Sequence, residues 1–137
     1  MELLIYSAEC GNADSQRDLG VRLWNEMKMY PLAFIYFKKS AEQGDPYSVY
    51  NLANHYYNGY GITQNHKKAL ELYKSAAEQD LPVALFELGC AYENGFHGIV
   101  SKDLSKAAEY YKKGAELGNI DCKNSLAAMY LKGKGVR

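Results

Sequence analysis

Apolar residues recur along the chain in blocks that fit one face of an α-helix. In SVYNLANHY (48–56), a small residue, a leucine, a second small residue and an aromatic residue stand at positions i, i+4, i+5 and i+8. The same order returns in ALFELGCAY (84–92) and CKNSLAAMY (122–130). This spacing places the apolar side chains on one side of a 3.6-residue helix. Each block therefore predicts an amphipathic helix with one buried face.

A second kind of helix is predicted after two glycine-rich links. The links are NGYGI (58–62) and NGFHGI (94–99), and the helices that follow are KKALELYKSAAEQ (67–79) and SKAAEYYKKGAEL (105–117). Glycine beyond a helix end accepts the left-handed backbone conformation that stops the helix. No strand is predicted anywhere in the chain, so the expected class is all-α.

The helical pattern repeats at a nearly constant period. Leu52, Leu88 and Leu126 are separated by 36 and 38 residues, and Leu19 lies 33 residues before Leu52. A period of this length is typical of arrays of helical hairpins. We therefore expect one repeat array over 1–137, divided into an N-terminal half-unit cap helix (1–12), a degenerate first repeat (13–45), a second repeat (46–81), a third repeat (82–119) and a partial fourth repeat (120–137).

A short phrase marks the corner between successive repeats. It reads KSAEQGDP (39–46), KSAAEQDLP (74–82) and KKGAELGNI (112–120). Gly44 and Gly118 are predicted to end the helices before two corners, and Asp80 takes this place at the third. Side-chain oxygens suited to cap the next helix belong to Asn12, Asp45 and Asn119, and Pro46 and Pro82 suit a first helical turn.

These repeats resemble the Sel-one-like repeat (SLR) family, a branch of the tetratricopeptide superfamily. The resemblance is carried by ALFELGCAYENG (84–95) followed by KAAEYYKKGAELG (106–118), and it is also strong over 46–81. The first unit departs from the pattern, because LWNEMKMYPLAF (23–34) lacks the glycine-rich link. The resemblance implies a right-handed superhelical solenoid of antiparallel helical hairpins that acts as a protein-binding scaffold.

Periodicity also predicts which residues form the core. Aromatic residues that recur in phase are expected to be buried: Phe37, Tyr56, Tyr73, Tyr92, Tyr111 and Tyr130. Small residues at equivalent positions are expected to let helices approach closely: Gly20, Ala53, Gly89 and Ala127. At the N-terminal end, Leu3, Leu4 and Ile5 are expected to cover the first full repeat.

A stripe offset from the core face is the candidate binding surface. It comprises Asp14, Arg17, Val21 and Trp24, then Tyr47, Tyr50, Asn54 and Tyr57, then Val83, Phe86, Cys90 and Glu93, then Asp121, Asn124, Ala128 and Leu131. In the superfamily that the sequence resembles, this stripe lines a concave groove. The predicted partner-binding residues are Arg17, Trp24, Tyr47, Tyr50, Asn54, Tyr57, Phe86, Glu87 and Glu93, with Asp18 beside them.

Packing between units is the alternative for these rings. We expect Trp24 and Tyr57 to be exposed near the loops, whereas Tyr47 and Phe86 fit packing and binding equally well. Exposed aromatic rings among polar neighbours are typical of binding hot spots, because they bury a large area with little loss of rotamer freedom. Asn25, Asn58 and Asn94 also align, and we interpret them as capping residues.

Composition narrows the classes of partner and compartment. Lys plus Arg and Asp plus Glu both total 16, so no net charge favours nucleic acid or an acidic membrane surface. No run approaches 18 apolar residues, and MELLIYSAEC (1–10) has no basic leader. We therefore expect a cytoplasmic protein. Cys10, Cys90 and Cys122 have no close pairing motif and are expected to be small buried or half-buried residues.

Catalytic, metal and cofactor motifs were not found in the sequence. His55, His66 and His97 lack metal-ligand spacing, and no phosphate-binding glycine loop follows a strand. The leading hypothesis is therefore a non-enzymatic scaffold that binds a partner protein or peptide. One alternative is a bacterial immunity protein or antitoxin that neutralises a toxin or effector. A second is a structural protein that self-assembles, present as a monomer or a weak end-to-end dimer.

Overall fold

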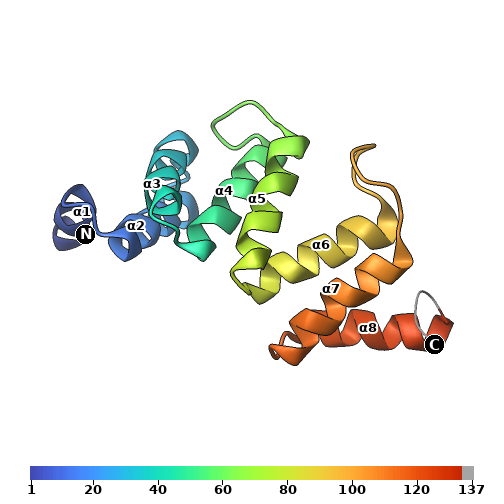
Figure 1. The fold of residues 1–137 in the computed structure, drawn as a ribbon. Helices are drawn as coiled ribbons and strands as arrows, with labels where there is room; N and C mark the ends of the chain where they lie inside the picture. Colours follow the sequence, from blue (N-terminus) through green and yellow to red (C-terminus); the bar gives the residue numbers. More distant parts are fainter. Residues whose placement is uncertain (134–137) are drawn as a thin grey trace. The chain divides into compact units, whose positions relative to one another are not determined.

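The computed structural model describes residues 1–133, which form eight helices (Figure 1). Within these residues the only β-type pairing is a single bridge between Phe96 and Val100. The all-α class is therefore confirmed. The helices are α1 (Glu2–Glu9), α2 (Ala13–Asn25), α3 (Tyr30–Glu42), α4 (Pro46–Asn58), α5 (His66–Glu78), α6 (Pro82–Asn94), α7 (Leu104–Glu116) and α8 (Ile120–Lys132).

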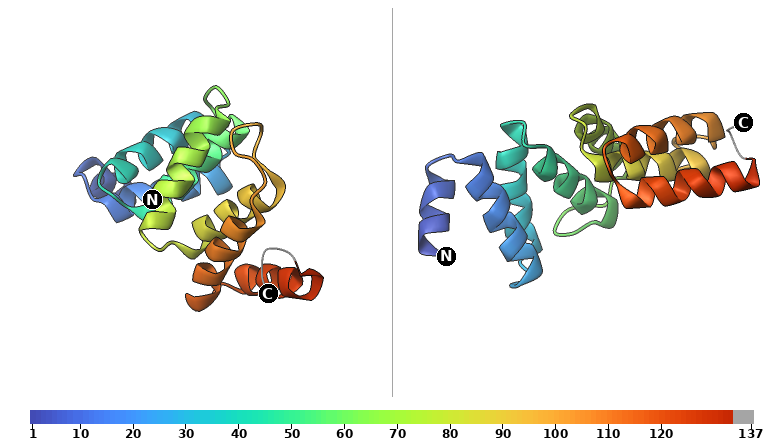
Figure 2. Two further views of the ribbon diagram at one scale, coloured as in Figure 1. Left: turned by 45° about the vertical axis from the view of Figure 1, so that its right-hand side comes forward. Right: turned by 90° about the horizontal axis from the view of Figure 1, so that it is seen from below.

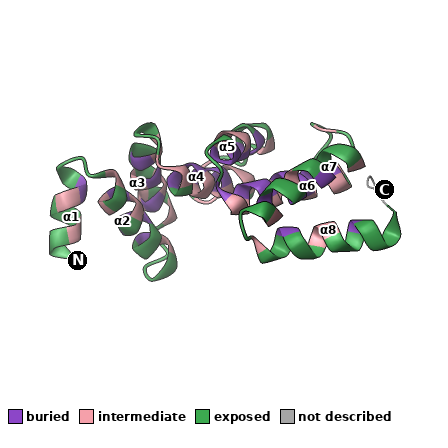
Figure 3. Cartoon of the chain, turned by 60° about the horizontal axis from the view of Figure 1, so that its bottom comes forward, coloured by how far each residue is buried: buried purple, intermediate pink, exposed green. Residues whose placement is uncertain are grey.

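The chain divides into two compact units, and the first comprises Met1–Leu72. Within it each helix packs on the next, α1 on α2, α2 on α3 and α3 on α4 (Figure 2). The core between α1, α2 and α3 is formed by Ala8, Leu19, Leu23, Ala33 and Phe37. Buried positions lie where these neighbouring helices meet (Figure 3).

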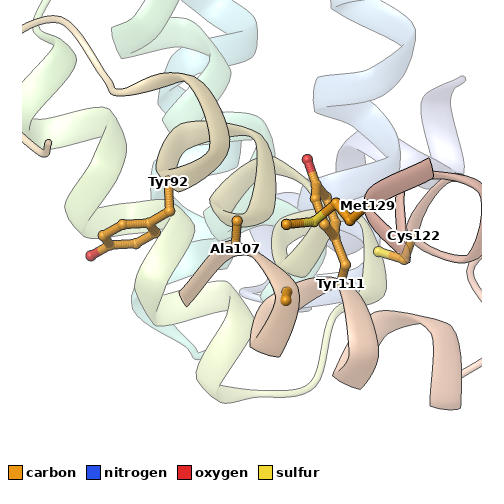
Figure 4. Packing of buried hydrophobic residues seen from close by; sticks show 6 residues of the cluster. Tyr92, Ala107, Tyr111, Cys122 and Met129 are labelled. Atoms are coloured by element: carbon orange, nitrogen blue, oxygen red, sulfur yellow. The ribbon is translucent and has the colours of Figure 1, made fainter. Parts of the chain in front are cut away.

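The second unit, Tyr73–Arg137, is organised in the same way around α6, α7 and α8. Its core cluster consists of Tyr92, Ala107, Ala108, Tyr111, Cys122 and Met129. Figure 4 shows Tyr111, Met129 and Cys122 gathered together, with Tyr92 on the other side of Ala107. Tyr111 comes from α7 and is fully buried, so α7 contributes the largest side chain at this centre.

The three corners share one pattern of backbone hydrogen bonds. The amides of Gly44, Asp80 and Gly118 donate to the carbonyls three residues earlier, at 2.9, 2.9 and 3.0 Å. All three residues are left-handed, with φ of 89°, 60° and 92°. Asp80 thus adopts the same turn as the glycines, although a side chain disfavours this conformation. The recurring phrase in the sequence is confirmed as a recurring turn.

Polar caps begin most of the helices where the sequence predicted them. The side-chain oxygens of Asn12, Asp45 and Asn119 accept the amides of Ser15, Ser48 and Cys122 at 2.8, 2.9 and 2.8 Å. Such caps satisfy amides that have no partner within the helix. Asn65 and Asp103 cap α5 and α7 in the same manner.

The first repeat joins its helices without a glycine. Lys28 takes the left-handed conformation, with φ of 55°, between α2 and α3. The Met29 amide then donates to the Leu23 carbonyl at 2.9 Å, which closes the turn. The glycine-rich link of the later repeats is therefore replaced here by a tighter junction.

Two glycines allow helices to approach closely, as the small-residue pattern predicted. A Cβ at Gly20 would lie 2.8 Å from the Phe37 ring, and one at Gly89 would collide with the Tyr111 ring. Ala53 is fully buried. The prediction was wrong for Ala127, which is exposed on α8. Within residues 1–133, α8 packs on α6 and α7 through the face that carries Cys122 and Met129, and Ala127 lies on the opposite, exposed face.

Other core predictions were also wrong at the first and last helices. Tyr130 is 51% exposed on α8, for the same reason as Ala127. Leu3 and Ile5 are 85% and 40% exposed, because α1 meets α2 through Leu4 and the buried Ala8 instead. Cys10 is exposed at the end of α1, whereas Cys90 is half-buried and Cys122 is buried.

Candidate partner-binding site

A cavity of about 190 Å³ lies between α2 and α4 in the first unit. The early part of α2 meets the start of α4 through the hydrogen bond from Arg17 to Asp45. The later parts of the two helices face each other across the cavity. Its lining consists of Val21, Trp24, Asn25, Phe37, Asn51, Asn54 and His55. Three of these residues, Val21, Trp24 and Asn54, belong to the stripe predicted from the sequence.

Trp24 forms one wall of the cavity and is held by two tyrosine rings. The centroids of Tyr30 and Tyr60 lie 5.7 and 5.6 Å from the indole, and both rings meet it edge to face. Tyr30 and Tyr60 stack on each other at 5.1 Å. Trp24 is therefore half-buried rather than exposed, and the expectation of an exposed side chain was wrong. The link between α4 and α5, which carries Tyr60, fixes the orientation of the indole.

His55 forms the inner part of the cavity and is 1% exposed. Its Nδ1 lies 2.8 Å from the Tyr60 carbonyl, which requires Nδ1 to carry the proton and to donate. Nε2 is then an acceptor, and it has no hydrogen-bond partner among the described residues. Burial lowers the pKa of His55, against the opposing effect of the bond to Tyr60. The ring is therefore neutral at pH 7.

Arg17 lies at the early end of the site among three carboxylates. Its guanidinium is 2.9 Å from Asp45, 3.4 Å from Asp14 and 3.5 Å from Asp18, and it stands over the Tyr47 ring at 5.6 Å. Burial acts to lower the pKa of Arg17, but the three carboxylates outweigh it and the pKa is raised. Arg17 is thus a paired cation, and the four charged groups together carry a net negative charge.

A second hollow of about 450 Å³ lies between α1 and α2. It is lined by Met1, Leu3, Leu4, Asp18, Val21 and Arg22. Val21 is 36% exposed and borders both this hollow and the cavity. The cavity and this hollow are therefore neighbours on α2, where they share Val21.

The remaining predicted residues of the first unit lie on α4 around the site. Tyr47 is 54% exposed, and Tyr50, Asn54 and Tyr57 are half-buried. The Tyr57 ring lies 4.9 Å from that of His66, and the expectation that Tyr57 is exposed was also wrong. Of the four side chains, only Asn54 lines the cavity.

In the second unit, two of the three predicted residues, Phe86 and Glu93, contact Tyr111. Phe86 is half-buried with its ring 6.0 Å from Tyr111, so packing explains it. The Tyr111 hydroxyl lies 3.2 Å from Glu93 and 3.4 Å from Cys90 Sγ, and it donates to one of these acceptors at a time. Burial raises the pKa of both Tyr111 and Cys90. Glu87 is half-buried on the same helix, α6.

Sequence reasoning missed several residues that build the first-unit site. Tyr30 and Tyr60 lie at a helix start and in a link, outside the helical periodicity that was read. Asn51 lines the cavity between stripe positions, and Asn25 lines it although it was interpreted as a cap. Asn58 and Asn94 do cap, donating to the carbonyls of Asn54 and Cys90 at 3.0 and 3.1 Å.

None of the described helices is both long and apolar enough to cross a bilayer. No group of three or more His, Cys, Asp or Glu side chains in residues 1–133 is arranged to hold a metal ion.

Solved structures resemble this chain over nearly its whole length. A protective antigen present in uropathogenic Escherichia coli strains, displaying an SLR fold, is 33% identical with a TM-score of 0.90 over 98% of this chain. A Sel1 repeat protein from Oxalobacter formigenes is 28% identical, with a TM-score of 0.87 over 97%. The chain spans 29% and 39% of the lengths of these two proteins.

A more distant relative shares the fold alone. Cysteine rich protein B from Helicobacter pylori is 20% identical, with a TM-score of 0.70 over 91% of this chain and 90% of its own. The SLR fold expected from the sequence is therefore confirmed.

The family model of the Sel1 repeat matches residues 13–45, 46–81, 82–119 and 120–137. Proteins of this family are generally protein-interaction scaffolds, and most are not catalytic. The repeated helical hairpins, the shared corners and these matches agree, and the chain belongs to the Sel1 repeat family.

Proposed function

We propose that this protein is a non-enzymatic scaffold that binds a partner protein or peptide, and that the cavity between α2 and α4 receives a side chain of that partner. The observation that carries the proposal is the cavity itself. An indole, Val21 and Phe37 offer apolar surface, and the amides of Asn25 and Asn51 lie around it. Mostly apolar hollows with a few polar groups are typical of binding sites.

The size of the cavity supports a side chain as its occupant. About 190 Å³ is less than the roughly 300 Å³ at which small-molecule pockets usually begin. Aromatic anchors that fill such a hollow commonly supply most of the affinity of an interface. The indole of Trp24 is already ordered by Tyr30 and Tyr60, so binding would cost little rotamer entropy.

A pair of matched variants tests the proposal. Val21→Asp places a carboxylate at the cavity, where desolvating it disfavours an apolar guest. Ile35→Asp makes the same change at a 46% exposed position on α3, outside the cavity. Tagged wild-type and variant proteins are used to capture partners from cells of the source organism. A protein retained by the wild type and by Ile35→Asp but lost by Val21→Asp supports the proposal; equal retention by all three contradicts it.

Self-association is a second candidate function, favoured by exposed apolar side chains on the first and last helices. Leu3 is 85% exposed on α1, and Leu131 is 89% exposed on α8. A weak end-to-end dimer would cover both. Light scattering over a hundredfold range of concentration tests this, since a constant monomeric mass contradicts it. An immunity or antitoxin role and a cytoplasmic location stay predictions from the sequence alone.

A further inference from the structure

We infer that the partner segment carries a basic side chain next to the apolar side chain that enters the cavity, an inference that rests on the proposed function. Arg17, one turn before the cavity residue Val21 on α2, stands among the carboxylates of Asp14, Asp18 and Asp45, and Asp18 lines the hollow that shares Val21 with the cavity. Together with the apolar lining of the cavity, this negative group favours a partner segment that carries both an apolar and a basic side chain.

The group carries an excess of negative charge because it contains more carboxylates than guanidinium groups. One guanidinium faces three carboxylates within 3.5 Å, which leaves a net charge of about −2 when all four are ionised. Asp14 and Asp18 keep side-chain exposures of 77% and 57%, so they remain accessible to an incoming cation. Asp45 is 10% exposed and is occupied by Arg17 and by the Ser48 amide. The two exposed carboxylates are therefore the ones that meet a partner.

The spacing between charge and cavity follows from helix geometry. Asp18 precedes Val21 by three residues on α2, slightly less than one turn, and Asp14 precedes it by seven residues, about two turns. One turn advances about 5.4 Å. Alternate residues of an extended peptide are about 6.6 Å apart on one side, and residues three or four apart on a helix are about 5–6 Å apart. A Lys or Arg at one of these intervals from the apolar anchor can reach the carboxylates.

The cavity also contains an acceptor that the protein itself does not satisfy. His55 Nε2 is buried and has no hydrogen-bond partner among the described residues. Leaving a buried acceptor unpaired is unfavourable, and such groups are few in native proteins. An anchor that combines an apolar body with an N–H or O–H group, such as a Trp or Tyr side chain, would supply the missing donor if it reached Nε2.

Two other features were weaker. The hollow lined by Lys74, Lys106 and Lys113 in the second unit has exposed lysines already engaged, Lys106 with the Tyr92 ring and Lys113 with Asp80. Cys90 is half-buried beside Tyr111, and desolvation raises the pKa of its thiol, which opposes reactivity.

Selection from a phage-displayed library of random dodecapeptides tests the inference. The full chain is the bait, and peptides that also bind the Val21→Asp variant are removed. We expect the remaining peptides to share an apolar residue with Lys or Arg two to four positions away. Binding of synthetic peptides is then followed by the fluorescence of Trp24, the only tryptophan in the protein.

Three measurements decide the outcome with these peptides. Asp14→Asn and Asp18→Asn should each weaken binding by about two- to fivefold, the range for exposed ion pairs. Glu42→Gln, an exposed carboxylate on α3, should leave affinity unchanged. Raising NaCl from 50 to 300 mM should weaken peptide binding to the wild type and have little effect on binding to a variant that carries both Asp14→Asn and Asp18→Asn.

The failures of the two proposals are distinguishable. Val21-dependent peptides without basic residues, or affinities insensitive to Asp14→Asn and Asp18→Asn, overturn the inference and leave the proposed function standing. A library that contains no Val21-dependent peptide overturns both. Because Asp14 and Asp18 are exposed, their variants are expected to fold, and an unchanged thermal transition verifies this.

Discussion

The guanidinium of Arg17 lies 2.9 Å from Asp45 Oδ1, while Asp45 Oδ2 accepts the Ser48 amide. One carboxylate thus caps α4 and ties it to α2. The pair is partly shielded from water, with side-chain exposures of 26% and 10%. This contact sets the separation of the two helices that enclose the candidate site.

Replacing Arg17 by methionine should therefore destabilise the first unit. The substitution keeps much of the aliphatic stem but removes the charged hydrogen bond, so we expect a loss of about 1–2 kcal/mol in the free energy of unfolding. Arg22→Met, an exposed arginine on the same helix, is the matched control. Urea denaturation measures both, and equal midpoints would show that the Arg17 contact contributes nothing.

His55 should make stability depend on pH. Its pKa is lowered in the folded protein, so between the ordinary value of 6.5 and the folded value the unfolded chain binds more protons. Stability should therefore be constant above about pH 7 and fall as the pH drops below 6.5. Denaturation of the wild type and of His55→Phe from pH 8 to pH 5 measures this.

The pH-dependent loss should be smaller in His55→Phe, and it should persist in His66→Gln and His97→Gln. These two histidines are not buried. Identical slopes in the wild type and in His55→Phe would exclude His55 as the source of the dependence.

Tyr60 should control the environment of Trp24. Tyr60→Ala removes the ring that meets the indole at 5.6 Å and stacks on Tyr30. We expect a red-shifted fluorescence emission and a loss of about 1–3 kcal/mol, because aromatic pairs and buried ring area are lost together. Tyr6→Ala, at a 70% exposed position on α1, should change neither quantity. An unshifted spectrum for Tyr60→Ala would contradict the ring cluster.

Substitutions at two of the corners should change stability in opposite directions. A Cβ at Gly118 would meet no atom within 4 Å, so Gly118→Ala costs only the left-handed backbone, about 1 kcal/mol. Asp80→Gly relieves the same strain and should raise stability by up to about 1 kcal/mol. It also removes the ion pair with Lys113, but both partners are exposed and contribute little. Thermal unfolding measures both, and a shift of the same sign in each would contradict a shared turn.

Most of the helices were predictable because their signals are local. The i, i+4, i+5, i+8 pattern placed α4, α6 and α8, and the caps Asp45 and Asn119 marked the starts of two of them. The position of the junction between α2 and α3 could not be predicted, because Lys28 adopts a left-handed conformation that is uncommon for lysine.

The candidate site was predictable only in part. Periodicity selected Trp24 and Asn54, which line the cavity, but it also selected Phe86, whose ring packs on Tyr111. Arg17 was chosen as a binding cation, and its pairing with Asp45 depends on a residue 28 positions away. A stripe on one helix does not reveal which neighbours a folded chain brings against it.

The sequence by itself determined that this chain forms repeated helical hairpins, since helix periodicity, caps and turns depend on residues a few positions apart. Only the tertiary structure decided that Trp24 packs against the stacked rings of Tyr30 and Tyr60, and that three carboxylates surround Arg17. It also decided that His55 Nε2 is buried with no hydrogen-bond partner among the described residues. These relationships join separate helices and links. Their geometry depends on how closely the helices pack, for example where the absence of a side chain at Gly20 makes room for the Phe37 ring.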